Sequence, residues 1–270
     1  MAKIKEETLR LSECTMDYIS FGNGEKPLIM IPGLSLRRVK GSGRGVALSY
    51  RIFAKDYRVY MFDTRNECDE SCSITQMADD LYEAMCALRI EQADLLGVSM
   101  GGMILQTLLI RHPKIIDHCV IALSASYCAE ISEKRIGEWI RLSEQKETDL
   151  LVRGFFNDLY SESYLKRYKP FMGLLVKMAS KADPVRFMNH AKAILKFDVR
   201  DQLSNVQTKA YVIGAKQDRI VPWQETVNIA AKLKAPYYLY ENLGHGAYEE
   251  AKDFNERVLK ALKGETDGRI

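Results

Sequence analysis

The sequence predicts an α/β fold, with a mostly parallel central sheet, helices on both faces and a helical cap insertion. Short apolar runs typical of buried strands alternate with segments whose apolar residues recur at helical spacing, and parallel strands need crossover helices of that kind. Between residues 130 and 200, by contrast, the chain carries helical spacing with no strong strand. We therefore expect one core domain made of 1–129 and 201–270, interrupted by a helical insertion over 130–200.

Before the insertion, strand and helix patterns follow one another. KIKEETLRL and CTMDYISF alternate polar and apolar residues, as exposed sheet edges do, whereas PLIMI is apolar throughout, as a strand buried on both faces is. Ser73 is placed to cap one helix, and Pro113 stops another. The expected elements are strands over 3–11, 14–21 and 27–31, a helix over 46–56, a strand over 57–63, a helix over 73–90, a strand over 93–99, a helix over 100–113 and a strand over 115–124.

From the insertion onward, helical patterns dominate at first and strands then return. Within the insertion we expect helical segments over 131–145, 149–168, 171–182 and 184–196. After it, KAYVIGAKQD and PYYLYENLG have strand patterns and flank a helix over 223–233. YEEAKDFNERVLKAL, residues 248–262, is expected to form one amphipathic helix near the end of the chain.

Composition excludes several classes of function. The 270 residues include 39 Lys and Arg against 36 Asp and Glu, and the basic residues are scattered, so we expect no nucleic-acid partner. The chain begins with charged residues where a secretory signal needs an apolar core, and no run reaches the roughly 18 apolar residues of a membrane span. We expect a cytoplasmic protein with a small-molecule substrate and no membrane partner. The number of subunits stays open, with a homodimer as one option.

Six cysteines are few for this length and form no paired CxxC clusters of the kind found in zinc sites. Cys68 and Cys72 are close along the chain, but no second pair or histidine lies near them in the sequence. They are interpreted as reduced loop thiols, with a metal or redox role as the alternative. No metal or cofactor site is predicted.

GVSMGG, residues 97–102, places a serine where an apolar strand pattern passes into a helix pattern. This has the form GxSxG, in which small flanking residues permit a tight turn that exposes the serine at the carboxyl edge of the sheet. The helix N-terminus beyond it offers unpaired backbone N–H groups. Ser99 is therefore the candidate nucleophile.

A serine nucleophile needs a base, and the chain has four histidines. His112 closes a helix, His118 lies in an apolar strand, and His190 belongs to the insertion. His245 stands between glycines in LGHGAYEE, after the last strand, where a flexible loop can direct an imidazole across the sheet edge. We predict His245 as the base, with an ordinary surface-loop histidine as the alternative.

The base needs an acid that fixes its tautomer and stabilises its positive charge. Asp218 follows a strand at its carboxyl end and precedes a turn into a helix, which also fits a helix-capping carboxylate. Asp198 and Asp201 precede that strand, and Glu241 comes too early in its loop to face His245. Asp218 is the predicted acid, and the chain order is Ser, Asp, His.

An oxyanion hole needs two backbone donors near the nucleophile. One is the N–H of Met100. The other is expected from IPGLSL, the loop after the PLIMI strand, where Gly33 lets the backbone bend and turns the Leu34 amide towards the site.

PGL, FDTR, SITQMADDL, GVSMGG, HP, GAKQDRIVP and GHGAYEE occur together in this order, and with them the chain resembles the α/β-hydrolase superfamily over nearly its whole length. The motifs look most similar to cofactor-free esterases, lactonases and haloperoxidase-like members. The resemblance implies Ser99 as nucleophile, Asp218 as acid, His245 as base, and the insertion as a cap over the pocket. Two features depart from the pattern: Pro32 and Gly33 replace a common histidine-glycine pair, and DTRNECDES replaces an arginine-glycine turn.

Aromatic and sulfur side chains in the insertion favour an apolar acyl pocket, with ordinary helix packing as the alternative for each residue. They are Trp139, Phe155, Phe156, Tyr160, Tyr164, Tyr168, Phe171, Met172, Phe187 and Met188. The loop SLRRVKGSGRG carries basic residues among glycines and is either an anion site or a mobile solvated loop. These basic residues are Arg37, Arg38, Lys40 and Arg44.

The sequence thus predicts a serine hydrolase that cleaves a small carboxylic ester, thioester or lactone through an acyl-enzyme. Because a fold does not fix a reaction, acyl transfer and carbon–carbon bond hydrolysis by the same triad remain open. A third alternative is a non-catalytic ligand-binding protein on this fold.

Overall fold

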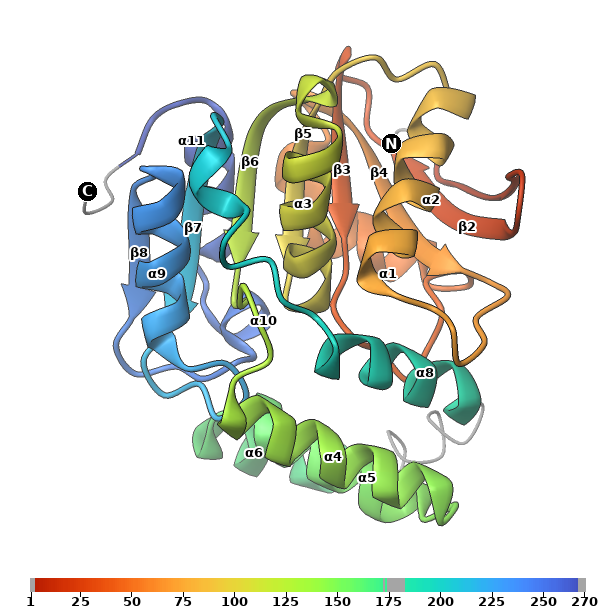
Figure 1. Ribbon diagram of the computed structural model, residues 1–270, viewed down its shortest axis with the longest axis vertical. Coiled ribbons are helices and arrows are strands. Elements are labelled where there is room, and N and C mark those ends of the chain that lie inside the picture. The colour runs from red at the N-terminus through yellow and green to blue at the C-terminus, as the bar shows by residue number, and fades with distance from the viewer. Residues whose placement is uncertain (1–2, 172, 174–182, 267–270) are drawn as a thin grey trace.

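The computed structural model describes residues 3–171, 173 and 183–266, and an eight-stranded sheet runs through its centre in the order β1-β2-β4-β3-β5-β6-β7-β8 (Figure 1). From β4 onward the sheet is parallel, whereas β2 pairs antiparallel with both β1 and β4. The strands are β1 (Lys5–Arg10), β2 (Thr15–Phe21), β3 (Lys26–Ile31), β4 (Tyr57–Arg65), β5 (Ala93–Val98), β6 (Ile116–Ala122), β7 (Lys209–Ala215) and β8 (Tyr237–Tyr240). The predicted mostly parallel α/β sheet is therefore confirmed.

One strand prediction is wrong. The alternation in CTMDYISF indicated an exposed edge, but nearly all of β2 is buried because β1 and β4 pair on its two sides. β1, at one end of the sheet, has the exposed pattern of an edge strand. Polar residues within β2 find partners: Asp17 accepts a hydrogen bond from Thr8 of β1.

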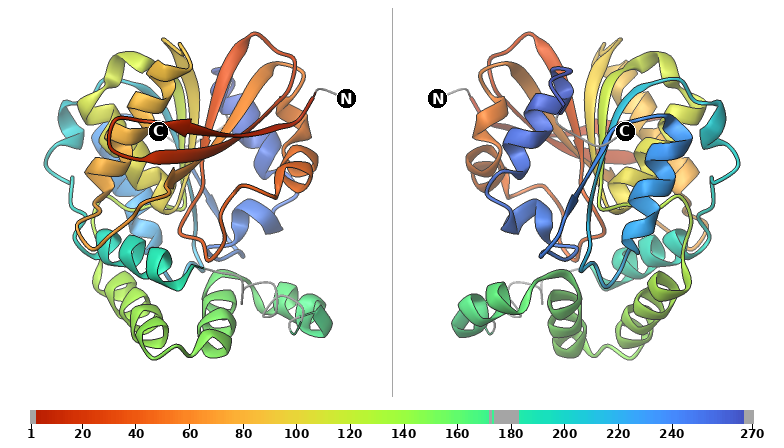
Figure 2. Two further views of the ribbon diagram at one scale, coloured as in Figure 1. Left: turned by 90° about the vertical axis from the view of Figure 1, so that its right-hand side faces the viewer. Right: turned by 90° about the vertical axis from the view of Figure 1, so that its left-hand side faces the viewer.

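Helices cover both faces of the sheet (Figure 2). One face carries α2, α3 and α9, whose apolar residues join the larger hydrophobic core, and the other carries α1 and α11. Their bounds are α1 (Gly43–Ser49), α2 (Ile74–Ala87), α3 (Met100–Arg111), α9 (Trp223–Leu233) and α11 (Phe254–Leu262). The hydroxyl of Ser73 accepts a hydrogen bond from the Gln76 amide, as the capping prediction requires.

A group of helices separates β6 from β7 and lies beyond the carboxyl ends of the parallel strands (Figure 1). It contains α4 (Glu130–Glu144), α5 (Thr148–Leu159), α6 (Glu162–Tyr168) and α8 (Pro184–Leu195). An isolated bridge between Tyr127 and Asp198 joins the two ends of this segment. The helix expected over 171–182 lies outside the described residues, apart from 171 and 173.

The helix expected over 248–262 is in fact two helices, α10 (Ala247–Glu250) and α11. Tyr248 lines a cavity at the carboxyl edge of the sheet, whereas Phe254 and Val258 pack in the core on the α11 face. One straight helix cannot reach both places. The chain therefore turns at Ala251, whose backbone is extended.

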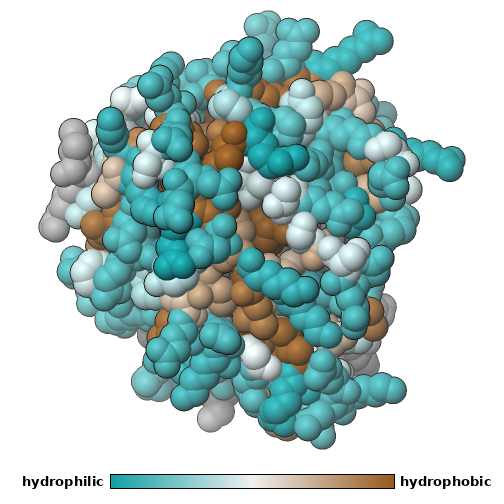
Figure 3. All heavy atoms as spheres, viewed as in Figure 1, coloured by the Kyte–Doolittle hydropathy of each residue, from teal (hydrophilic) through white to brown (hydrophobic). Residues whose placement is uncertain are grey.

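No helix in the described part of the chain is long and apolar enough to cross a membrane. On the face drawn in Figure 3, hydrophilic side chains predominate, and apolar ones show between them in small areas.

Candidate active site

Ser99 lies in the sharp turn that joins β5 to α3. Its backbone has φ 55° and ψ −119°. Residues other than glycine rarely adopt this conformation, which costs about 1–3 kcal/mol. The turn places the start of α3 very close to β3, and this needs a glycine at position 101. A Cβ on Gly101 would lie 2.0 Å from the Ile31 carbonyl oxygen. The Ser99 amide donates to the Ala122 carbonyl at 2.9 Å and so fixes the turn on β6.

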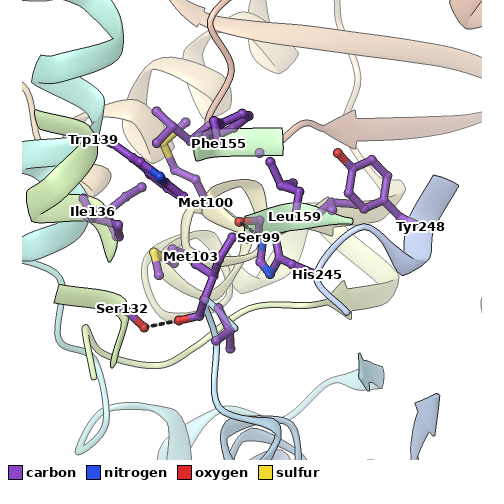
Figure 4. A pocket seen from close by; sticks show the side chains of 16 residues that line it. Ser99, Met100, Met103, Ser132, Ile136, Trp139, Phe155, Leu159, His245 and Tyr248 are labelled. Atoms are coloured by element: carbon purple, nitrogen blue, oxygen red, sulfur yellow. Dashed lines mark hydrogen bonds between the residues drawn. The ribbon is translucent and has the colours of Figure 1, made fainter. Parts of the chain in front are cut away.

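The structure brings Ser99, His245 and Asp218 into one hydrogen-bonded chain. His245 Nε2 lies 2.9 Å from Ser99 Oγ, and His245 Nδ1 lies 2.7 Å from Asp218 Oδ2. The side chains of His245 and Asp218 are only 3% and 2% exposed, so water hardly competes for these bonds. Ser99 and His245 face one another in the close-up view (Figure 4).

The Asp218 carboxylate is held by its own turn as well as by the imidazole. Its Oδ1 accepts hydrogen bonds from the amides of Ile220 and Val221, both at 2.8 Å, which leaves Oδ2 directed at His245. This turn precedes α9, whose N-cap residue is Pro222, and Asp218 binds the two amides before that residue. The helix-capping alternative for Asp218 is therefore wrong.

The competing acids are engaged elsewhere. Asp198 pairs with Arg200 at 2.6 Å, and Glu241 pairs with Lys216 at 2.9 Å. Asp201 lies before β7, away from its carboxyl end.

The other three histidines have structural surroundings. His112 stacks on the Tyr82 ring with centroids 3.8 Å apart, and His118 lies near Asp117 at the opposite edge of the sheet. His190 is buried, with Nε2 3.1 Å from the Thr64 hydroxyl oxygen. Burial and the nearby Arg186 lower the pKa of His190 to about 3, so its ring is neutral near pH 7.

The loop after β3 packs directly against the serine. A Cβ added to Gly33 would lie 3.0 Å from Ser99 Cβ, so a glycine lets this loop approach. Leu34 and Met100 line the same cavity as Ser99 and His245. Among the described residues, no hydrogen bond from either backbone amide is recorded, and the oxyanion-hole role of Leu34 and Met100 stays a prediction.

A family model described as "alpha/beta hydrolase fold" matches residues 26–252. That range contains every residue of the Ser99 site. The chain belongs to the α/β-hydrolase family.

Individual relatives are distant but similar in length. The chain is 25% identical over 254 residues to the "Putative carbamate hydrolase RutD" of Rhizobium rhizogenes, covering 90% of this chain and 95% of the relative. It is 21% identical over 221 residues to 3-oxoadipate enol-lactonase 2 of Acinetobacter baylyi, covering 80% of each. The crystal structure of the enol-lactonase from Burkholderia xenovorans superposes with a TM-score of 0.84 at 18% identity, covering 95% of this chain and all of that one.

The cavity at Ser99 of this α/β-hydrolase is small and mainly apolar (Figure 4). Its volume is about 40 Å³, on a scale where one water needs about 10–15 Å³, so it holds about three waters or a short acyl group. Helices of the inserted segment supply much of the wall. The lining side chains include Met103, Ser132, Ile136, Trp139, Phe155, Leu159, Ile194, Ile220, Val221 and Tyr248.

A larger cavity of about 860 Å³ adjoins the first and shares Leu34, Met100 and Tyr248 with it. It is more polar, since charged side chains such as Arg186 and Asp63 line it. The small cavity and the large one thus meet beside the serine.

Partial burial in the site affects the phenol of Tyr248. Loss of solvation and the nearby Glu249 raise its pKa, so the Tyr248 hydroxyl stays protonated near pH 7.

The aromatic side chains of the insertion divide between lining and packing. Trp139 and Phe155 line the small cavity, and Tyr160 and Tyr164 line the large one. Phe187 is completely buried against Trp139 and Phe155, as the packing alternative expects. Of the other aromatic and sulfur residues named from the sequence, Phe156, Tyr168, Phe171 and Met188 line neither cavity. Met172 lies outside the described residues.

The basic loop is tied down by acidic partners. Arg38 pairs with Asp183 at 3.2 Å, and Lys40 lies 3.4 Å from Asp17. The Gly41 and Gly43 amides both donate to Glu6. These contacts argue against a mobile solvated loop. The anion-site alternative stays a prediction, and Arg37 and Arg38 line the large cavity.

Sequence reasoning missed a buried polar network between β4 and α8. Arg186 donates to Asp63 and, at 2.7 Å, to the Thr64 hydroxyl, which in turn contacts His190. Arg186 and His190 lie one turn apart on a single helix. The spacing of Arg186 and His190 on one helix face is the feature of the sequence that could have indicated this network. On an amphipathic helix, however, polar residues at this spacing ordinarily face solvent.

Proposed function

We propose that this α/β-hydrolase cleaves a small carboxylic ester, thioester or lactone through an acyl-enzyme on Ser99. The observation that carries the proposal is the continuous hydrogen-bonded chain from Ser99 through His245 to Asp218, which lies beside the small apolar cavity. Nucleophile, base and orienting acid within hydrogen-bond reach are the geometric requirement for activating a serine.

The proposed steps follow from these positions. Ser99 Oγ attacks the carbonyl carbon while His245 Nε2 takes its proton, and the amides of Leu34 and Met100 donate to the oxygen that becomes negative. The bond to the leaving group breaks, and His245 returns the proton to the leaving oxygen or sulfur. Water then attacks the acyl-enzyme by the same route, which releases the acid and restores Ser99.

The names of the relatives support carbonyl chemistry of this type. They include a carbamate hydrolase and an enol-lactonase, both named for the hydrolysis of a carbonyl compound. We therefore place carbamates beside esters, thioesters and lactones in the substrate panel.

The test is Ser99→Ala, assayed with p-nitrophenyl acetate beside Ser163→Ala, which changes an exposed serine of α6. Ser99→Ala is expected to lower kcat by at least about 10³-fold, because the acyl-enzyme cannot form, while Ser163→Ala stays near the native rate. A serine-directed fluorophosphonate should label native protein and not Ser99→Ala. Normal turnover by Ser99→Ala would overturn the assignment.

The large cavity leaves room for an acceptor other than water, so acyl transfer is the second candidate. Adding an alcohol during ester turnover separates the two, because transfer yields a new ester and hydrolysis yields only the acid. Ligand binding without fluorophosphonate labelling of the native protein would instead indicate a binding protein.

A further inference from the structure

The loop between β4 and α2 meets α8 at a cluster of sulfur and nitrogen donors. Cys68 and Cys72 come from the loop and His190 comes from the helix, and one ligand atom of each lies within 4.8 Å of the others. Along the chain the histidine is far from the cysteines, which is why their spacing alone indicated ordinary thiols. The fold supplies the third donor.

This donor set is the one that zinc prefers. Zinc binds cysteine sulfur at about 2.3 Å and histidine nitrogen at about 2.0–2.1 Å in tetrahedral geometry, which places two sulfurs about 3.8 Å apart. Donor atoms within 4.8 Å need side-chain movements of only about 1 Å to reach that geometry. Cys72 and His190 are 5% and 1% exposed, whereas Cys68 is partly exposed, so water can reach a fourth position.

Two buried polar atoms on the same turn of α8 point to a ligand here. Asn189 donates through Nδ2 to the Cys68 carbonyl at 2.9 Å, but its buried Oδ1 has no hydrogen-bond partner among the described residues. Arg186 Nε is likewise buried without a partner there. Buried polar atoms are ordinarily paired. A zinc-bound water would donate to Asn189 Oδ1, and a zinc-bound thiolate would accept from Arg186 Nε.

Nearby positive charges do not forbid a cation. Arg65 pairs with Asp80 at 2.7 Å, and Arg186 pairs with Asp63, so both guanidinium groups are neutralised by carboxylates. Two thiolates then balance the charge of Zn²⁺.

A second group of donors, Asp94, Asp117 and His118, provides a contrast. There Lys26 already lies between the carboxylates, 2.7 Å from Asp94 and 2.8 Å from Asp117. A protein cation occupies that cluster, so it carries no proposal.

We propose that Cys68, Cys72 and His190 bind Zn²⁺ as a structural site separate from Ser99. The metal joins α8 of the inserted segment to the loop that follows β4. Its expected effect is on the attachment of α8, and the reaction at Ser99 needs no metal in the mechanism above.

The experiment uses tag-free, reduced full-length protein. After incubation with excess zinc and desalting, elemental analysis should give one zinc per chain, and Co²⁺ in its place should show a sulfur-to-cobalt charge-transfer band. Zinc should also raise the Tm of the native protein. Cys72→Ser should weaken zinc binding by at least about tenfold and lose the cobalt band.

Cys86→Ser is the matched control because Cys86 is an exposed cysteine of α2 outside the cluster, and it should bind zinc as the native protein does. Cys68→Ser, at a partly exposed position, repeats the test if Cys72→Ser fails to fold. Equal zinc uptake by native protein and Cys68→Ser would overturn the proposal. So would reduced native protein that takes up no zinc and shows no charge-transfer band.

Discussion

Asp218 shows how much a single carboxylate contributes to the geometry of the site. One carboxylate oxygen accepts hydrogen bonds from two amides of its own turn, and the other accepts one from His245 Nδ1. The imidazole therefore presents Nε2 to Ser99. An amide in place of the carboxylate keeps the shape but offers an N–H to His245, which favours the wrong tautomer.

We therefore expect Asp218→Asn to lower kcat for p-nitrophenyl acetate by about 10⁴-fold with little change in KM. Glu241→Gln is the control, since Glu241 is an exposed acid paired with Lys216. Retention of activity within about tenfold of the native rate by Asp218→Asn would contradict the role of this residue.

Gly33 leaves room for Ser99 because it has no side chain. A methyl group at this position would contact Ser99 Cβ at 3.0 Å, closer than ordinary packing allows, so Ser99 or the loop after β3 must shift. Gly33→Ala is expected to reduce kcat by roughly tenfold or more, because small displacements of reacting groups are costly in rate. Gly137→Ala in α4 meets no atom within 4 Å and should leave kcat unchanged while raising Tm slightly. Equal kinetics for both variants would show that the Gly33 contact is unimportant.

Among the elements, the inserted helices set the size of the space beside Ser99. Trp139 of α4 and Phe155 of α5 pack edge to face with ring centroids 4.9 Å apart and close one side of the small cavity. The aromatic content of this segment favours a roomy acyl pocket, but the rings pack largely on one another. The result is a cavity of about 40 Å³.

Short acyl chains should therefore be the better substrates if the acyl group enters this cavity. We expect kcat/KM for p-nitrophenyl acetate to exceed that for the octanoate by at least about tenfold, because a long chain has to displace packed rings. Trp139→Ala should shift the preference towards longer chains. An unchanged chain-length profile in this variant would show that the acyl group lies elsewhere.

The elements also show where sequence patterns succeed and fail. The turn at Ser99 and the alternation of strands with helices follow from local patterns, and the strand-turn-helix context around Ser99 makes the motif informative. The burial of β2 and the break between α10 and α11 depend on which neighbours pair with each segment. The approach of His190 to Cys68 depends on long-range packing in the same way, and single-sequence periodicity carries no such information.

At the scale of the whole molecule, the two edges of the sheet differ. The carboxyl edge carries Ser99, whereas the opposite edge carries an ionic network in which Lys26 joins Asp94 and Asp117. Tyr57 adds a hydrogen bond to Asp94 at 2.8 Å. This network links the first residues of neighbouring strands and has a structural role. Location in the cytoplasm stays a prediction from the sequence.

The network makes stability depend on acid. The hydrogen bond from Lys26 lowers the pKa of Asp117 in the folded protein below its ordinary value. The stabilisation that the ionised Asp117 gives to the folded state is therefore fully present above about pH 4, the pKa in the unfolded chain. It is lost as the pH falls through the lower pKa of the folded state. Asp117→Asn should lower the free energy of unfolding at pH 7 by about 1 kcal/mol or less and make its decline below pH 4 shallower. Urea unfolding between pH 3 and 7 measures both, and parallel curves for variant and native protein would contradict this.

A hydrogen bond ties the loop of His245 to α5. The Gly246 amide donates to the Leu159 carbonyl, at the end of that helix, at 2.7 Å. Lifting α5 away from the sheet breaks this bond and frees the residue next to His245. We therefore predict that any opening of the site at α5 also displaces the His245 loop, so that the opened form turns over substrate more slowly. Faster amide hydrogen exchange at Gly246 would accompany each such opening.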